Sequence, residues 1–260
     1  MGRGLGLSEA DCRLEHWHLC DPHLARLVKG AAQKAGRERP VVAYPYSPLV
    51  ADPLGLWAAE LGGPICGPAI LPRSTAGKTL GWKEKDREII FHRTVEPYYE
   101  LLEQTVREAL RASPLVLVLT LRSFNSIPLE FEKSRAYPRP QIVVNSAGGL
   151  TPKGLTGLAF GTFRAFHWWV EQSWPQTGSA WLPPHLRTLP RVKALGLSLC
   201  RGLYMDERNG EPKESLVGAR RILGTLFNLL EQEMDRVSQV RLSRVEEEKK
   251  KSPVIKAARR

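Results

Sequence analysis

The sequence has 260 residues, of which 42% are hydrophobic and 25% charged, with a formal net charge of +11 at pH 7. This size and apolar content suit one large α/β domain, and no apolar run approaches the ~18 residues that a membrane helix needs. The first twenty residues are polar and predict no signal peptide. We expect a cytoplasmic protein whose four cysteines, which lie far apart without framework spacing, are reduced thiols: Cys12, Cys20, Cys66 and Cys200.

The positive charge is partly concentrated at the end of the chain. Residues 244–260 hold seven Lys or Arg against three Glu, and therefore carry +4 of the total +11. We predict a single domain over residues 1–243, followed by a basic tail over 244–260 that is disordered or a frayed helix. A basic balance favours anionic partners without identifying one, and a solubilising surface is the simpler explanation.

Helix and strand signals alternate along the first hundred residues. Residues 1–20 are predicted to be irregular. Asp21-Pro22 predicts the start of a helix that ends at Gly36, because Asp favours the N-cap and Pro the first turn. The remaining predicted elements are a strand over 40–44, a helix over 52–61, a strand over 65–71 and a loop over 72–92.

The second part of the chain carries the clearest signals. Residues 97–110 place their apolar side chains on one helical face. After Ser113-Pro114, the run Leu115 to Leu121 is apolar except at Thr120, which predicts a strand buried on both faces. A helix followed by a buried strand is typical of an α/β sheet. The later predicted elements are a strand over 141–144, a helix over 157–172, a strand over 192–199 and a helix over 216–240.

In α/β sheets, functional residues lie just beyond the carboxyl ends of the strands. We therefore expect three strand ends to meet, namely residues 44–48, 120–126 and 198–204. The polar side chains of the central strand end carry this expectation: Thr120, Arg122, Ser123, Asn125 and Ser126.

Five short motifs occur in order between residues 41 and 207. They are Val-Val-Ala-Tyr-Pro-Tyr-Ser-Pro at 41–48, Pro-Tyr-Tyr-Glu-Leu-Leu at 97–102, Leu-Val-Leu-Thr-Leu-Arg-Ser at 117–123, Asn-Ser-Ala-Gly-Gly at 145–149 and Leu-Ser-Leu-Cys-Arg-Gly-Leu-Tyr-Met-Asp-Glu at 197–207. The sequence resembles the N-formylglutamate amidohydrolase family, zinc hydrolases related in fold to zinc carboxypeptidases. The last motif is the most specific, because Arg-Gly-Leu-Tyr-Met-Asp-Glu is similar almost letter for letter to that of the family. The resemblance spans roughly residues 40 to 235 and implies a three-layer α/β/α fold, phosphorylase/hydrolase-like, with a mostly parallel mixed sheet.

At the positions that hold and use zinc in the family, this chain carries other residues. The two histidine ligands correspond to Tyr46 and Arg122, the acid before the second histidine to Thr120, the helix-start histidine to Tyr99 and the general-base glutamate to Ser198. A hydrolytic zinc needs three His or carboxylate ligands and an open position for water. Arginine has no lone pair to donate and repels the metal, and a serine cannot deprotonate water at neutral pH without its own base. We predict that the zinc centre is lost and that no cofactor is bound.

Arg122 suggests a different role, because a guanidinium at a strand end can hold a carboxylate or phosphate with paired hydrogen bonds. In the family that the sequence resembles, arginines near these positions would hold the acidic substrate. We predict a small anion pocket or, as an equal alternative, a simple ion pair between Arg122 and Asp52. The residues predicted to line the pocket are Arg122, Ser123, Asn125, Asn145 and Arg201.

Two other clusters could carry chemistry. Five possible metal ligands crowd near the start of the chain, but their spacing fits no finger pattern and we predict no metal there: Cys12, His16, His18, Cys20 and His23. His92 and Glu96 lie four residues apart, and form either a replacement acid–base set with Asp86 and Glu88 or a capped helix entry.

Three functions remain as hypotheses. The first is a pseudoenzyme of the amidohydrolase family that binds a small anionic ligand or a protein partner. The second is an active amidohydrolase with a relocated site that acts on N-acyl acidic amino acids. The third is a nucleic-acid-associated protein, which no recognised nucleic-acid motif supports.

Overall fold

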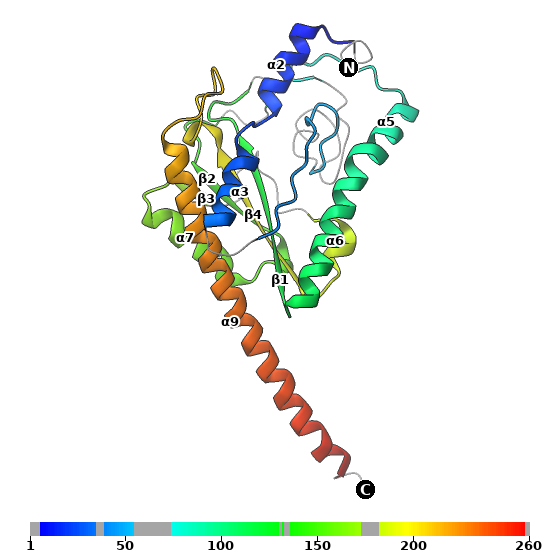
Figure 1. The fold of residues 1–260 in the computed structure, drawn as a ribbon, viewed down its shortest axis with the longest axis vertical. Helices are drawn as coiled ribbons and strands as arrows, with labels where there is room; N and C mark the ends of the chain where they lie inside the picture. The colour runs from blue at the N-terminus through cyan, green and yellow to red at the C-terminus, as the bar shows by residue number, and fades with distance from the viewer. Residues whose placement is uncertain are drawn as a thin grey trace.

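The computed structural model describes residues 6–34, 39–54, 74–129, 132, 136–172 and 182–257. Their centre is a mixed four-stranded sheet with helices on both faces, the α/β architecture that the sequence predicts (Figure 1). In spatial order, the strands are β1 (Val116–Phe124), β4 (Val192–Cys200), β2 (Ile142–Ser146) and β3 (Val170–Gln172). The pairs β1–β4 and β2–β3 are parallel, and β2 runs antiparallel to β4.

Three helices cover one face of the sheet. They are α3 (Leu24–Lys34), α7 (Lys153–Ala165) and α9 (Ser215–Ala257), and α3 packs against α9. The alternation of side chains along a strand sends Leu195, Leu197 and Leu199 of β4 to this side, where they are fully buried in the main core. Leu27 of α3 and Leu223 of α9 are fully buried in the same core.

The opposite face is covered by α6 (Glu96–Ala112) and the short α8 (Pro184–Arg187). Val106 of α6 and Leu186 of α8 pack with Val192 and Ala194 of β4 in a second, smaller core. Helix α6 leads directly into β1, so its first turn lies at the end of the sheet where β1 finishes (Figure 1). This connection brings the start of α6 to the predicted functional edge.

Two predicted irregular regions are in fact helical. Helix α2 (Glu9–Leu19) begins with a capping box, in which Ser8 and Asp11 each accept the other's backbone N–H. Helix α5 (Glu84–Ile90) and a π-helical turn, η1 (Phe91–Val95), continue into α6. Helix α2 is polar and shows no apolar stripe in the sequence, and α5 is only seven residues long and has no side-chain cap. Neither helix therefore gives the periodic signal on which the two predictions depended.

Other predicted boundaries also change. Residues 40–44 form no strand, and β1 is an edge strand of the described sheet whose first seven residues are half-buried. The predicted helix 157–172 begins earlier, at Lys153, ends at Ala165 and is followed by β3. Short 3-10 helices, η2 (Gly148–Leu150) and η3 (Arg201–Leu203), follow β2 and β4. The predicted helix over 52–61 and strand over 65–71 lie mostly or wholly outside the described residues.

The last helix, α9, continues through most of the basic tail to Ala257 and extends away from the body of the molecule (Figure 1). Of the helices in the described part of the chain, none combines the length and apolar character needed to cross a membrane.

Candidate functional site

Three neighbouring strands direct polar side chains to the α6 face of the sheet. Arg122 of β1 and Ser198 of β4 are register partners, and β2 contributes Asn145. The Ser198 hydroxyl oxygen accepts one hydrogen bond from Arg122 Nε (3.1 Å) and one from Asn145 Nδ2 (3.1 Å). Ser198 is completely buried, so this hydroxyl holds the two donors together inside the protein. These residues form the Arg122–Ser198–Asn145 triad.

A buried carboxylate lies near the triad. Burial lowers the pKa of Arg122 to about 10, while the negative charge of Asp52 acts in the opposite direction. The guanidinium therefore stays protonated at neutral pH. Asp52 is only 3% exposed, and its Oδ1 accepts a hydrogen bond from the backbone N–H of Leu54 (3.1 Å). A cation and an anion thus share this end of the sheet.

Tyrosines from the start of α6 and from the segment over residues 39–54 lie close to Asp52. Tyr44 contacts Tyr46 and Tyr98 edge to face, with ring centroids 5.6 and 5.4 Å apart. The Tyr99 hydroxyl donates to the carbonyl of Pro53. Burial raises the pKa of Tyr44 to about 12 and that of Tyr99 well above the usual range. These two phenols are therefore neutral at physiological pH, and Tyr46 is 43% exposed.

This set of side chains does not fit a catalytic zinc ion. Arg122 is a cation, the buried phenols are protonated, and the Ser198 hydroxyl already accepts two hydrogen bonds. Thr120, half-buried and two residues before Arg122 on the same face of β1, offers only a hydroxyl. Within the ranges that the structure describes, no three His, Cys, Asp or Glu side chains lie together in a way that could hold a metal. Beside the triad, Thr120 and the tyrosines, Asp52 supplies a single carboxylate, whereas a catalytic zinc ion needs three protein ligands.

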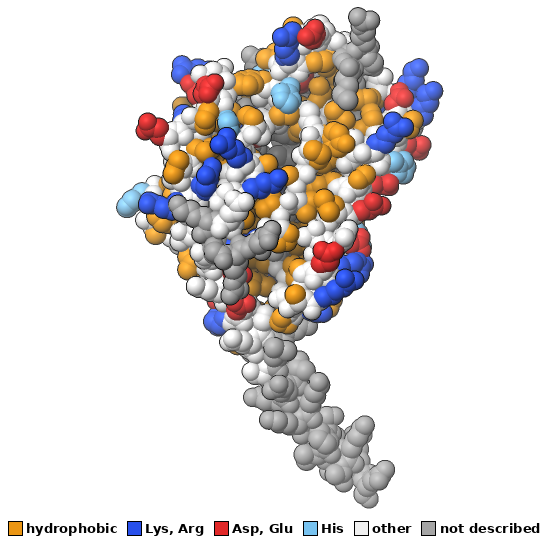
Figure 2. Space-filling view, viewed as in Figure 1, with side chains coloured by type: hydrophobic (Ala, Val, Ile, Leu, Met, Phe, Trp, Pro, Cys, Tyr) orange, Lys and Arg blue, Asp and Glu red, His pale blue; other side chains and the backbone are white. Residues whose placement is uncertain are grey.

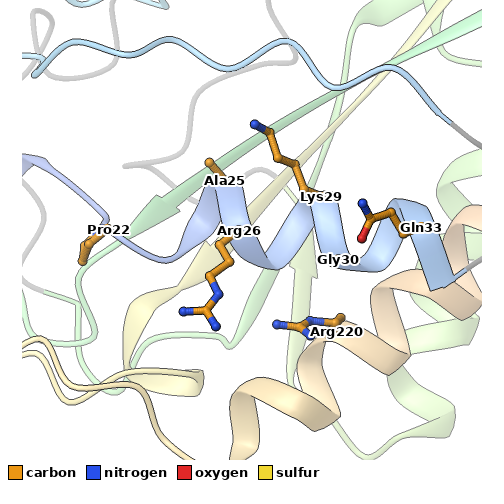
Figure 3. Close-up of a pocket in the computed structure, with 7 residues that line it drawn as sticks. All are labelled: Pro22, Ala25, Arg26, Lys29, Gly30, Gln33 and Arg220. Atoms are coloured by element: carbon orange, nitrogen blue, oxygen red, sulfur yellow. The ribbon is translucent and has the colours of Figure 1, made fainter.

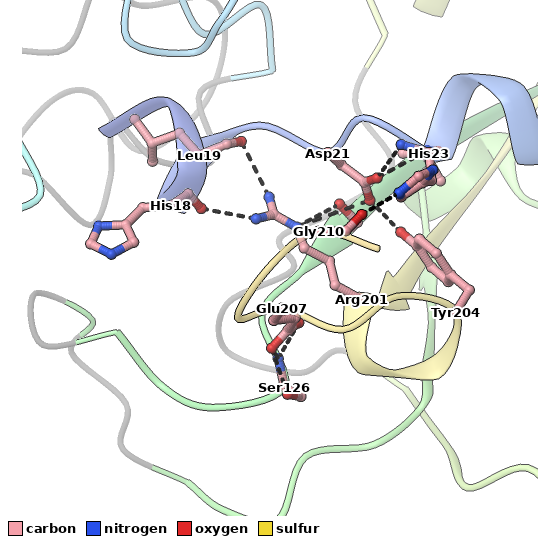
Figure 4. A network of polar contacts seen from close by, with 11 residues as sticks. His18, Leu19, Asp21, His23, Ser126, Arg201, Tyr204, Glu207 and Gly210 are labelled. Carbon is pink, nitrogen blue, oxygen red and sulfur yellow. Dashed lines mark hydrogen bonds and ion pairs between the residues drawn. The ribbon is translucent and has the colours of Figure 1, made fainter. Parts of the chain in front are cut away.

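Arg201 and Ser123 belong to a separate cluster. Ser123 follows Arg122 in β1 and therefore points to the other face of the sheet. Arg201, 2% exposed, donates from Nε to Ser123 Oγ (3.1 Å) and from its terminal nitrogens to the carbonyls of His18 (3.0 Å) and Leu19 (3.2 Å). Figure 4 shows this guanidinium reaching the last turn of α2. Of the residues predicted for one anion pocket, the structure therefore places Arg122 and Asn145 in the triad and Ser123 and Arg201 in this second cluster.

The rest of the motif that begins at Arg201 also makes structural contacts. The Tyr204 hydroxyl donates to Asp21, whose Oδ1 accepts from the backbone N–H groups of His23 (2.9 Å) and Leu24 (3.0 Å). Glu207 accepts hydrogen bonds from the Ser126 backbone N–H (2.9 Å) and hydroxyl (2.6 Å). We call residues 201–210 the clasp, because they tie α2 and α3 to the strand ends (Figure 4).

The clasp ends at a glycine that the packing requires. Gly210 has φ +73°, and a Cβ there would lie 2.2 Å from the ring of Trp17. Its carbonyl pairs with His23 Nε2 (2.7 Å), and Trp17 Nε1 donates to the carbonyl of Glu207 (3.1 Å). Local sequence does not reveal Asp21 and His23 as partners of this motif, because they lie about 180 residues away from it.

Two solved structures are similar to this chain over most of its length. The N-formylglutamate amidohydrolase of Ralstonia eutropha JMP134 is 20% identical, with a TM-score of 0.64 over 90% of this chain and 88% of that chain. A gene product of Agrobacterium tumefaciens is 16% identical, with a TM-score of 0.56 over 87% of this chain and 84% of that chain. The chain has the N-formylglutamate amidohydrolase fold. No protein-family model matches the sequence, and neither does a curated protein.

Within this fold, Asn125 is placed apart from the triad. Its backbone carbonyl accepts from Arg139 Nη1 (3.0 Å), and Arg139 forms an ion pair with Glu132 in which both side chains are 1% exposed. The Asn125 side-chain oxygen is buried and has no hydrogen-bond partner in the structure. Asn125 thus joins a buried structural pair.

The clustered histidines and cysteines near the start of the chain do not converge. His18 Nδ1 pairs with Thr75 Oγ1 (3.0 Å), whereas His23 contacts the clasp. Cys12 and Cys20 are free thiols, as is Cys200, and Cys66 lies outside the described residues. His92 and Glu96 contact each other on the surface (Nδ1 to Oε2, 2.7 Å), and this contact raises the pKa of His92. The capped helix entry predicted there is absent, because η1 continues into α6 without a side-chain cap.

Proposed function

We propose that this chain is a divergent relative of the N-formylglutamate amidohydrolases that no longer hydrolyses an amide at its strand ends. The observation that carries the proposal is the Arg122–Ser198–Asn145 triad with the charge of Asp52 beside it. By the sequence resemblance, Arg122 and Ser198 occupy positions of a zinc ligand and of the general base. The triad joins those two side chains by a hydrogen bond and buries the serine completely.

The electrostatic consequence is large. Two unit charges 4 Å apart interact by about 4 kcal/mol near a protein surface, so a divalent cation at that distance from Arg122 is opposed by about 8 kcal/mol. For comparison, structural zinc in zinc-finger peptides binds with roughly 10–16 kcal/mol at pH 7. The guanidinium would therefore cancel about half or more of the affinity that a complete ligand set could supply. Asp52 offsets part of the repulsion, but it already compensates the charge of Arg122.

The charge of Asp52 near Arg122 also argues against the predicted anion pocket. A carboxylate that already lies near this guanidinium disfavours a second anion, which supports the ion-pair alternative. We therefore propose a pseudoenzyme whose former catalytic edge is a polar structural core. Its binding role, for an anionic ligand or a protein partner, would be carried by other surfaces.

Hydrolysis of N-formyl-L-glutamate and N-acetyl-L-glutamate by the full chain, with and without added zinc, tests the proposal. We expect no release of the amino acid above the rate without protein, under conditions in which an active N-formylglutamate amidohydrolase turns over. Zinc-dependent turnover that Arg122→Ala abolishes and the exposed control Arg93→Ala retains would contradict the proposal. Turnover that survives Arg122→Ala would instead establish the alternative, an amidohydrolase with a relocated site.

A further inference from the structure

A basic groove lies between α3 and α9, on the other face of the sheet from the Arg122–Ser198–Asn145 triad. It has a volume of about 450 Å³, within the range of sites for small ligands. Its lining includes Ala25, Arg26, Lys29, Gly30 and Gln33 of α3 and Arg220 of α9 (Figure 3). We call this feature the α3–α9 groove.

The cations of the α3–α9 groove have no acidic partner among the residues that the structure describes. Three of the described lining residues are cations, Gln33 adds an amide, and none of them is a carboxylate. Arg220 Nε is buried without a hydrogen-bond acceptor. Neither Arg26 nor Lys29 forms an ion pair with any residue that the structure describes. Because an unsatisfied buried donor is costly and like charges repel, an anion bound here would relieve both penalties.

Gly30 allows Arg220 to reach the groove. A Cβ at position 30 would lie 2.7 Å from Nε and 2.9 Å from Cδ of Arg220, so any larger residue would displace this side chain. With glycine, the Arg220 side chain lies against α3 at position 30, and its guanidinium points toward that of Arg26 in Figure 3. Two guanidinium groups that face each other are suited to hold the oxygens of one tetrahedral anion from both sides.

We propose that the α3–α9 groove binds the phosphate group of a small ligand, through Arg26 and Arg220 with Lys29 adding charge. A phosphate carries nearly two negative charges at neutral pH and matches three cations better than a carboxylate does. The groove is separate from the triad, so this inference is independent of whether the strand ends hydrolyse a substrate.

Calorimetric titration of the full chain with inorganic phosphate and with adenosine monophosphate, at constant ionic strength, tests this inference. We expect saturable binding of at least one of them. Tighter binding of inorganic phosphate identifies free phosphate as the ligand type, and tighter binding of the nucleotide identifies a phosphate ester. Arg26→Gln and Arg220→Gln should each weaken binding by about tenfold or more, because each removes a charge-assisted hydrogen bond. The control Arg221→Gln removes an equal charge from an exposed position of α9 and should leave affinity unchanged.

Gly30→Ala provides a second, charge-neutral test. It should weaken phosphate binding by displacing Arg220, while circular dichroism verifies that the fold is retained. Equal losses in Arg221→Gln and Arg26→Gln would overturn the proposal, since they would show a general charge effect. The absence of saturable binding would also overturn it, as would binding of single-stranded oligonucleotides without binding of either small phosphate.

Discussion

Replacement of Arg201 by methionine should destabilise the protein severely. In the structure, Arg201 satisfies the Ser123 hydroxyl and the carbonyls of His18 and Leu19 in the last turn of α2. It also lies 4.0 Å from the buried carboxylate of Asp21. Methionine keeps a similar apolar stem but offers no donor and no charge. The substitution therefore removes three hydrogen bonds and a cation 4.0 Å from Asp21.

The size of the loss follows from burial. Each carbonyl left without a donor in the interior costs about 1–3 kcal/mol, and breaking a buried ion pair from one side costs about 3–5 kcal/mol. These costs are not additive, because the carbonyls at the end of α2 can bind water once that end of the helix loosens. We therefore expect the free energy of unfolding to fall by about 4 kcal/mol. That is a large part of the 5–15 kcal/mol by which a domain is usually stable.

Urea denaturation followed by tryptophan fluorescence measures this loss. The matched control is Arg208→Met, which removes the same charge from the clasp at a side chain that is 90% exposed and paired only at the surface. We expect the control to change the free energy of unfolding by less than about 0.5 kcal/mol. Similar small changes in both variants would refute the view that the clasp is structural.

Two further predictions concern buried polar groups. Ser198→Ala removes the hydroxyl that accepts hydrogen bonds from Arg122 and Asn145. It should lower the free energy of unfolding, measured by urea denaturation, by about 2 kcal/mol. An unchanged free energy of unfolding would show that the triad does not stabilise the fold. Burial raises the pKa of Cys200 to about 11, so at pH 8 its alkylation by iodoacetamide should be roughly a hundredfold slower than that of a free small-molecule thiol. Because the folded state holds this proton more tightly, the thiol favours folding below about pH 9, and that contribution is lost as the pH rises toward 11. Rapid native-state labelling of Cys200, read by mass spectrometry, would contradict the prediction.

The apolar patterns of the sequence predict the sheet and its main helices well. Two apolar runs predict the strands β1 and β4, and one apolar stripe predicts helix α6. The structure confirms these three elements. Residues 40–44 carry the same kind of signal without forming a strand, because pairing depends on a neighbour that local sequence does not reveal. Helix α2 has a readable signal in Ser8 and Asp11, but its apolar content is low.

The candidate site is predicted in part, for physical reasons. The sequence predicts that Arg122, Ser198 and Asn145 lie at one edge, and their strands are neighbours in the structure. Ser123 could have been separated from Arg122 by strand alternation alone. The role of Arg201 could not be predicted, because two of its acceptors are backbone carbonyls brought to it by tertiary packing.

The zinc content of the purified full chain tests the central proposal most directly. Elemental analysis after expression in zinc-supplemented medium and gel filtration should find far less than one zinc ion per chain, for both the wild type and Arg122→Ala. In the wild type, the positive charge of Arg122 opposes a divalent cation at the strand ends. The Arg122→Ala variant lacks this charge and therefore tests whether the other side chains there can hold zinc by themselves. One zinc per wild-type chain, lost on substitution of Asp52 or Tyr46, would contradict the account and restore the strand ends as a metal centre.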